Sequence, residues 1–174
     1  AQRAAVERAF LEKNCYLIQG PPGTGKTTVI RELVEQVFET NPRANVLIVS
    51  QANVAVDNAL SGKLLDKYAG EIVRCGNADK ISNALQNVTI SARCDEYLSA
   101  LEERKDRFSP EFYEKWLDVV APKGFGGISP TLCEVVIKSH RLVGATCVGI
   151  ARKQIGLERM EFDLVIVDEA GKAL

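Results

Sequence analysis

The chain has 174 residues, in which 22 lysines and arginines nearly balance 23 aspartates and glutamates. This balance excludes a protein that binds nucleic acid through bulk positive charge, although a local basic patch is compatible with it. No apolar run approaches the roughly 20 residues of a membrane helix, residues 1–3 begin no signal peptide, and the five cysteines form no C-x-x-C pair, so we expect an intracellular protein, cytoplasmic or nuclear, without a membrane partner.

Apolar runs alternate with helical patterns along the chain. We expect a helix over residues 2–11, and then strands over 16–19, 46–50, 72–75, 141–145 and 162–167 with helices between them. The pattern after residue 52 predicts one helix that carries Leu60, Leu64, Leu65 and Tyr68 on one face and ends at Gly70. Apolar strands separated by helices indicate an α/β fold with a parallel sheet covered on both faces.

The first strand leads into a phosphate-binding loop. Residues 20–27 complete the pattern G-x-x-x-x-G-K-[ST], in which glycines let backbone N–H groups converge on phosphate oxygens at the start of a helix. We expect Lys26 to contact the β- and γ-phosphates of a nucleoside triphosphate and the Thr27 hydroxyl to ligate Mg²⁺. An ordinary Gly/Pro turn between a strand and a helix is the alternative. The predicted nucleotide-binding residues are Gly20, Pro22, Gly23, Thr24, Gly25, Lys26, Thr27 and Thr28.

The middle of the chain interrupts this alternation. Nearly half of residues 92–118 are charged, and Ser109-Pro110-Glu111 predicts a helix start. A Gly/Pro-rich stretch then leads to a short return helix. We interpret the segment as an inserted helical hairpin, although a solvated excursion that contacts no ligand is the alternative. The predicted division of the chain is 1–91 for the first part of a P-loop domain, 92–138 for the helical insertion and 139–174 for the second part of the P-loop domain.

The last strand ends in two adjacent carboxylates. Asp168 is expected to hold the Mg²⁺ shell, directly or through water, and Glu169 to polarise a water for in-line attack on the γ-phosphate. By itself this pattern is that of a strand that meets a solvated loop, and the upstream phosphate loop favours the catalytic interpretation. The two motifs together predict Mg²⁺-dependent hydrolysis of a nucleoside triphosphate, with Lys26 and Glu169 as catalytic residues.

Four blocks in chain order resemble the superfamily 1 helicases, specifically the branch of the nonsense-decay and senataxin-type helicases. They are motif I at 18–28, motif Ia at 50–60 with the pattern S-x-x-N-x-A-V-D, motif Ic at 144–149 and motif II at 167–171. Gln2 lies 18 residues before Gly20, where this family places the glutamine that reads adenine. The resemblance implies a RecA-like core that binds ATP and Mg²⁺ and couples ATP hydrolysis to movement along single-stranded RNA or DNA.

The resemblance also implies contacts to the phosphate backbone of the single strand. Short hydroxyl and amide side chains suit phosphate oxygens and carry no base information. The implied residues are Ser50, Asn53 and Val54 in motif Ia and Thr146 in motif Ic. From the residues alone, Ser50 and Asn53 equally fit helix capping, and Gln2 fits an exposed terminal side chain. The inserted helices resemble the stalk and 1B region that flanks the nucleic-acid channel in this branch.

The resembling helicases continue with motif III, whose glutamine senses the γ-phosphate, and with a second RecA-like domain that supplies arginine fingers. Neither is found before Leu174. In this class the motif III strand inserts between the phosphate-loop strand and the Asp-Glu strand. We therefore expect a gap in the sheet and a fragment that is inactive by itself, or a missing strand supplied by another chain. The alternative functions are a P-loop ATPase switch or remodeller without nucleic acid, and an ATP-binding scaffold module without catalysis.

Overall fold

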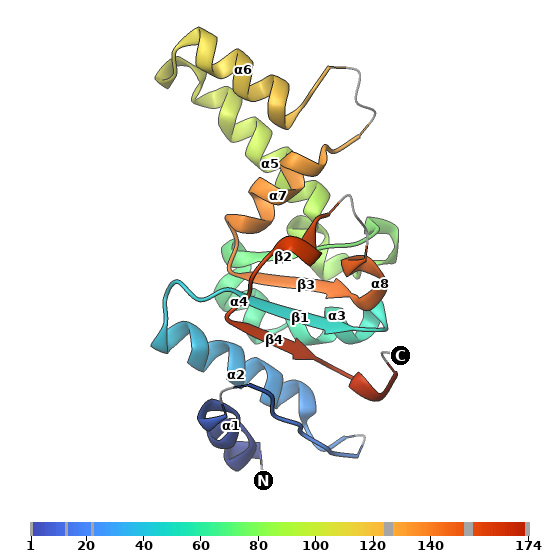
Figure 1. Cartoon of the computed structure of the whole chain (residues 1–174). Coiled ribbons are helices and arrows are strands. Elements are labelled where there is room, and N and C mark those ends of the chain that lie inside the picture. Colours follow the sequence, from blue (N-terminus) through green and yellow to red (C-terminus); the bar gives the residue numbers. More distant parts are fainter. Residues whose placement is uncertain (1, 13, 22, 124–126, 152–154, 173–174) are drawn as a thin grey trace.

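The sheet at the centre of the molecule is parallel throughout. The computed structural model describes residues 2–12, 14–21, 23–123, 127–151 and 155–172. Within these ranges the sheet has four strands in the order β2-β3-β1-β4 (Figure 1). Their bounds are Val46–Ser50 for β1, Ile72–Arg74 for β2, Leu142–Thr146 for β3 and Leu164–Val167 for β4. These four strands confirm the predicted α/β class and lie within two residues of their predicted bounds.

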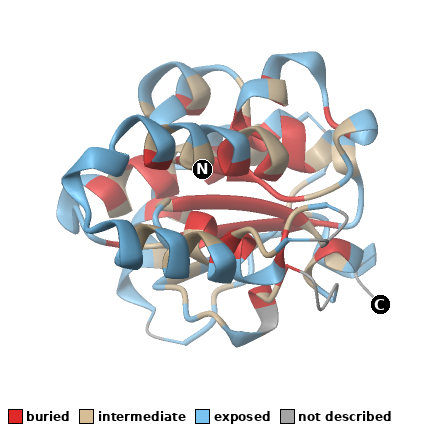
Figure 2. Ribbon diagram, turned by 90° about the horizontal axis from the view of Figure 1, so that it is seen from above, coloured by how far each residue is buried: buried red, intermediate tan, exposed pale blue. Residues whose placement is uncertain are grey.

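Alternate residues of β1 face two different hydrophobic cores, because successive side chains of a strand point to opposite faces. Val46 and Ile48 lie in the core under one set of helices, which are α2 (Lys26–Thr40), α3 (Asn53–Leu60) and α4 (Lys63–Tyr68). Leu47 and Val49 lie in the core under the other set, which is α5 (Ile90–Glu103) and α7 (Pro130–Lys138). Figure 2 shows the buried strands between helices with exposed outer surfaces. The sheet is covered on both faces, as predicted.

The first helix and the outer part of the predicted insertion lie outside this sandwich. Helix α1 (Gln2–Leu11) has the predicted bounds and packs on α2 through a small core of Val6, Val29 and Leu33. Helix α6 (Pro110–Val120) begins at the predicted signal, because the Ser109 hydroxyl accepts a hydrogen bond from the Phe112 N–H at 3.3 Å. In Figure 1 the outer part of α5 and all of α6 project away from the sheet.

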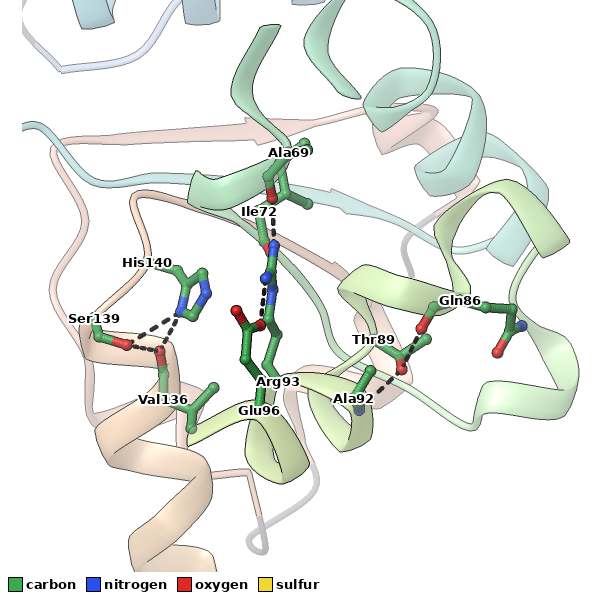
Figure 3. Close-up of polar contacts among 10 residues, drawn as sticks. All are labelled: Ala69, Ile72, Gln86, Thr89, Ala92, Arg93, Glu96, Val136, Ser139 and His140. Carbon is green, nitrogen blue, oxygen red and sulfur yellow. Dashed lines mark hydrogen bonds and ion pairs between the residues drawn. The ribbon is translucent and has the colours of Figure 1, made fainter. Parts of the chain in front are cut away.

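A buried arginine attaches the base of α5 to the start of β2. Arg93 Nε donates to the Ile72 carbonyl at 3.1 Å, Nη2 donates to the Ala69 carbonyl, and Nη1 pairs with Glu96 at 2.6 Å (Figure 3). The inner half of α5 is thus part of the sheet's packing, and the predicted boundary at residue 92 stays a prediction.

His140 borders β3, as predicted, and its Nδ1 lies 2.7 Å from the Val136 carbonyl. Burial lowers the pKa of His140 below its ordinary value.

The single helix predicted after β1 is wrong, because the structure divides it into α3 and α4. Gly62 separates them with φ 66° and ψ −131°, a conformation that glycine adopts without a steric penalty. Leu60 and Leu64 nevertheless lie in the same core, as their spacing predicted. The helical face was therefore predicted correctly, and the continuity of the helix was not.

The strand predicted over residues 16–19 is also wrong. This segment has no strand assignment, the sheet ends at β4, and Leu17 is 82% exposed. Val165 and Val167 of β4 are 50% and 44% exposed. An apolar run becomes a strand only where a neighbour offers hydrogen bonds, and no described segment pairs with the outer edge of β4. The predicted gap between these two segments stays a prediction.

Helix α3 approaches the sheet closely at Gly144. A Cβ at this position would lie 2.5 Å from Leu60 Cδ1 and 3.1 Å from Val56 Cγ1, both on α3. Gly144→Ala should therefore destabilise the protein by about 1–3 kcal/mol, because the core must shift to accept the methyl group. Urea denaturation measures the difference. Gly70→Ala is the control, since its Cβ would meet no atom within 4 Å; equal losses in both variants would contradict this packing.

Candidate functional site

One cavity brings together motifs from opposite ends of the sequence. Its volume is about 370 Å³, and three segments form its walls. They are the phosphate loop with the start of α2 (Gly23, Gly25, Lys26, Thr27), the outer side of α3 (Ala55, Asn58), and the residues after β4 (Asp168, Glu169). The parallel sheet explains why two of these walls meet, because α3 follows β1 and the Asp168–Glu169 turn follows β4, and the carboxyl ends of these paired strands share one edge of the sheet. The structure therefore brings both predicted catalytic residues and both predicted metal ligands to one cavity.

Backbone conformation fixes the shape of the phosphate loop. Gly23 and Gly25 have φ of +77° and +83°, which side chains with a Cβ rarely adopt. The Thr24 hydroxyl donates to the Pro21 carbonyl at 2.8 Å and closes the turn. No side chain caps the start of α2, so the N–H groups of its first turn are available to an anion. Pro22 lies outside the described residues.

Lys26 lies against its own loop. Its Nζ donates to the Gly20 carbonyl at 2.9 Å and to the Pro21 carbonyl at 3.0 Å. Both acceptors are neutral, and a phosphate oxygen attracts the ammonium group more strongly because it carries a full opposite charge. An anion at the cavity wall can therefore replace these two carbonyl partners.

The two carboxylates after β4 differ in their surroundings. The Asp168 N–H continues the ladder of the sheet by donating to the Val49 carbonyl at 2.8 Å, and Asp168 Oδ1 accepts from the Glu169 N–H at 2.9 Å. Glu169 has φ of 54°, the left-handed region, and its carboxylate pairs with Lys172 at 3.2 Å. Backbone strain of this kind occurs at functional sites. The turn places both carboxylates opposite the phosphate loop.

The remaining predicted nucleotide residues lie at the edge of this cavity or outside it. Gln2 Nε2 donates to the Thr24 carbonyl at 2.8 Å, so its side chain lies on the phosphate loop although the residue is exposed. Gly20, Thr24 and Thr28 do not line the cavity. A Cβ on Gly20 would lie 2.7 Å from Thr24 Oγ1, which gives this glycine a packing role within the loop.

The four residues predicted to bind single-stranded nucleic acid lie near the carboxyl ends of β1 and β3. Ser50 and Thr146 are neighbours in the register of these two β-strands. Val54 is 69% exposed, whereas Ser50 is fully buried and its hydroxyl has no partner among the described residues. In this conformation the Ser50 side chain therefore cannot contact a bound nucleic-acid strand.

The capping interpretation of Ser50 and Asn53 is wrong. Helix α3 has Ala52 at its N-cap position and no side-chain cap. Asn53 Oδ1 instead accepts a hydrogen bond from Arg74 at 2.8 Å. Of the four predicted nucleic-acid-binding residues, Thr146 is the one that caps a helix. Its hydroxyl accepts from the Gly149 N–H at 3.0 Å at the start of α8 (Cys147–Ile150).

Sequence reasoning missed Asn58 and Arg31. Asn58 lines the cavity, and Arg31 on α2 donates to the Asn58 carbonyl at 2.5 Å and to the Ala59 carbonyl at 3.3 Å. An arginine that satisfies the last carbonyls of a helix stabilises its C-terminus. It also ties the phosphate-loop helix to α3. No spacing in the sequence indicates either role, because the two helices meet only in the folded chain.

Comparison with known proteins gives a family and a set of relatives. Residues 1–118 match a family described as an AAA domain. An uncharacterized ATP-dependent helicase of Methanocaldococcus jannaschii is 42% identical over 49% of this chain and 13% of its own length. The DNA polymerase alpha-associated DNA helicase A of Schizosaccharomyces pombe is 29% identical over 100% of this chain and 28% of its own length.

A third relative is the human DNA replication ATP-dependent helicase/nuclease DNA2, which is 30% identical over 98% of this chain and 13% of its own length. The chain thus spans only 13% to 28% of these three relatives. Among the described residues, none of the helices combines the length and the apolar character that crossing a bilayer requires.

Proposed function

Because the chain belongs to this family of AAA domains, we propose that it is the ATP-binding and ATP-hydrolysing core of a helicase or translocase that moves along single-stranded nucleic acid. The observation that carries the proposal is the cavity shared by the phosphate loop, α3 and the Asp168–Glu169 turn. Membership of an AAA domain family implies ATP binding. The cavity adds carboxylates opposite the phosphate loop, where hydrolysis would require them.

The residues around the cavity fit a bound Mg²⁺ ion. The Thr27 hydroxyl and the Asp168 carboxylate both line it, and oxygen ligands of this kind are what Mg²⁺ prefers. A bound Mg²⁺ would neutralise charge on the phosphates. Lys26 would exchange its contacts with the Gly20 and Pro21 carbonyls for phosphate oxygens, and the uncapped N–H groups of α2 would hold the same anion.

Glu169 is the group we propose as the base that orients the attacking water. Its carboxylate lies at the cavity and shares a salt bridge with Lys172. Asp168 is held by the sheet ladder and by its own turn, so the two carboxylates have separate tasks. Gln2, on the outer side of the phosphate loop, is proposed to read the adenine base.

We propose nucleic acid as the partner because the names of the relatives and the positions of motifs Ia and Ic agree. The relatives named above are helicases, one a DNA helicase and one a DNA replication helicase/nuclease by name. Motif Ia places Asn53 and the exposed Val54 at one end of α3, and Thr146 lies nearby at the end of β3. Asn53 and Thr146 also have structural partners in Arg74 and the Gly149 N–H, so the preference over a P-loop ATPase switch or remodeller without nucleic acid rests on the ordered motifs and the exposed Val54. We propose a single strand, DNA or RNA, as the substrate track.

The finer assignment rests on the ordered motifs. We propose membership of superfamily 1 in the nonsense-decay and senataxin-like branch, with segments 1–91 and 139–174 forming the RecA-like part and 92–138 a stalk-like insertion. The partner for catalysis is a second RecA-like domain that supplies arginine fingers. Without it, residues 1–174 should hydrolyse ATP at no useful rate, because such arginines contribute about 10³–10⁵ in rate in comparable P-loop systems. An intracellular setting, cytoplasmic or nuclear, fits this function.

Lys26→Ala should weaken Mg²⁺–ATP binding by about 1.5–3 kcal/mol, because a charge-assisted hydrogen bond to phosphate is lost. Isothermal titration calorimetry on the 174-residue chain measures the effect. Lys80→Ala is the control, since Lys80 lies on the short turn Ala78–Lys80 and does not line the cavity. Equal affinities of wild type and Lys26→Ala for Mg²⁺–ATP would show that the phosphate loop does not bind the nucleotide.

Glu169→Gln should preserve ATP binding and reduce hydrolysis by roughly 10²-fold or more, because the amide keeps the volume but loses the proton-accepting oxygen. Steady-state phosphate release in the protein at its natural length, together with nucleotide affinity, separates the two effects. Near-normal turnover in this variant would exclude Glu169 as the base.

Thr146→Ala should weaken binding of single strands about equally for all base sequences, because phosphate contacts position a strand without reading it. Thr146→Ser is the matched control, since it keeps both the hydroxyl and the cap of α8. If Thr146 only caps α8, Thr146→Ala will cost about 1 kcal/mol of stability and leave strand affinity unchanged. Fluorescence anisotropy and thermal unfolding on the same samples distinguish the two roles.

A further inference from the structure

Arg74 is the largest fully buried side chain of the described core, with 0% of its surface exposed. A buried guanidinium is tolerated only when its donors are paired. Nε donates to Asp57 Oδ1 at 2.7 Å, Nη2 to Asn53 Oδ1 at 2.8 Å, and Nη1 to the Cys75 carbonyl at 2.5 Å. Each nitrogen of this guanidinium therefore has an oxygen partner, and two of the three partners come from α3.

Asp57 is itself fully engaged. It is 5% exposed, and its second oxygen, Oδ2, accepts from the Ser82 N–H at 2.7 Å. Asn53 and Asp57 are four residues apart on α3, so they lie one above the other on the same helix face. Gly144, the register neighbour of Arg74 on β3, lets this face approach the sheet. The arginine, the aspartate and the glycine thus fix where Asn53 lies.

The arginine also fixes which way round the Asn53 amide lies. A guanidinium has donors and no acceptor, so it must face the amide oxygen. Oδ1 therefore points inward to Arg74, and the Nδ2 group, with two N–H donors, is left on the other side. Among the described residues Nδ2 has no hydrogen-bond partner, and Asn53 is partly exposed. Two N–H donors that no described residue holds suit a phosphate oxygen, whereas the reversed amide would present its oxygen and repel it.

We propose that Arg74 and Asp57 are positioning residues that hold the Nδ2 donors of Asn53 toward the phosphate backbone of a bound single strand. This inference rests on the proposed function, and it adds a buried pair behind the strand-binding surface. Neither Arg74 nor Asp57 touches the strand. Their effect passes through the orientation of one amide at the first residue of α3.

The most direct test is Asn53→Asp. The substituted carboxylate keeps an oxygen for Arg74 and replaces the outward donors with a second oxygen, so the fold is retained and the contact is inverted. Strand affinity should fall about tenfold or more, because a charge-assisted hydrogen bond is lost and like charges face each other. Fluorescence anisotropy with a labelled homopolymeric single strand measures this in the protein at its natural length. Unchanged affinity would overturn the proposal.

Arg74→Lys tests the positioning step, because an ammonium cannot bridge Asp57 and Asn53 as the planar fork does. It should weaken strand binding about as much as Asn53→Ala, and the double variant should be no weaker than either single variant. Additive losses, or wild-type affinity in Arg74→Lys, would show that Arg74 does not act through Asn53. If Arg74→Lys does not fold, Asp57→Asn in the same cycle and Asn53→Asp decide the question.

Arg93→Lys is the matched control. Arg93, on α5, is the other arginine that is buried among the described residues, and its partners are the Ile72 and Ala69 carbonyls and Glu96 (Figure 3). It should lose stability and keep strand affinity. If Asn53→Ala leaves strand affinity unchanged while Thr146→Ala lowers it, the positioning proposal fails and the proposed function stands. If the wild-type protein binds no strand, the proposed function itself fails.

Discussion

The position of α3 is the constraint on which both halves of the proposed site depend. Gly144 brings this helix close to β3, Arg31 holds its last carbonyls from α2, and Arg74 holds its first turn from β2. One side of the helix then lines the cavity through Ala55 and Asn58, while its first residues lie at the proposed strand-binding surface. Because α3 has only eight residues, a shift of the helix at the nucleotide cavity would also displace Asn53 and Val54 at the proposed nucleic-acid surface.

The two arginines that are buried among the described residues, Arg74 on β2 and Arg93 on α5, show how its partners determine the role of a buried charge. Arg93 is satisfied mainly by backbone carbonyls, which every residue type supplies, and it ties α5 to β2. Arg74 is satisfied mainly by side chains of α3, and so its charge specifies the identity of those residues. A buried ion pair is weak evidence for stability but can specify one arrangement. We infer specification for Arg74, because an apolar residue there would leave Asp57 buried without its partner.

Sequence patterns correctly predicted the bounds of β1 and α1, and the Ser109 signal correctly predicted the start of α6. Each of these features depends on local patterning and capping. The phosphate loop and the Asp-Glu turn were recognisable because their spacing is demanded by the anion. The break at Gly62, the burial of Ser50 and the Arg74 contacts were not predictable, because each depends on which elements meet in space. One signal was nevertheless present: an arginine inside the apolar run 72–75 requires a partner, and motif Ia offered Asn53 and Asp57.

The phosphate loop keeps its shape although the segment before it is not part of the sheet. Residues 16–19 have no strand assignment, yet Gly23 and Gly25 hold left-handed conformations, and Thr24 and Lys26 donate to the loop's own carbonyls. The loop is therefore stabilised from within and by the first turn of α2. Asp168 is held separately, through the ladder between β4 and β1. The two walls of the cavity therefore have separate supports, and among the described residues neither wall depends on a strand paired with the outer edge of β4.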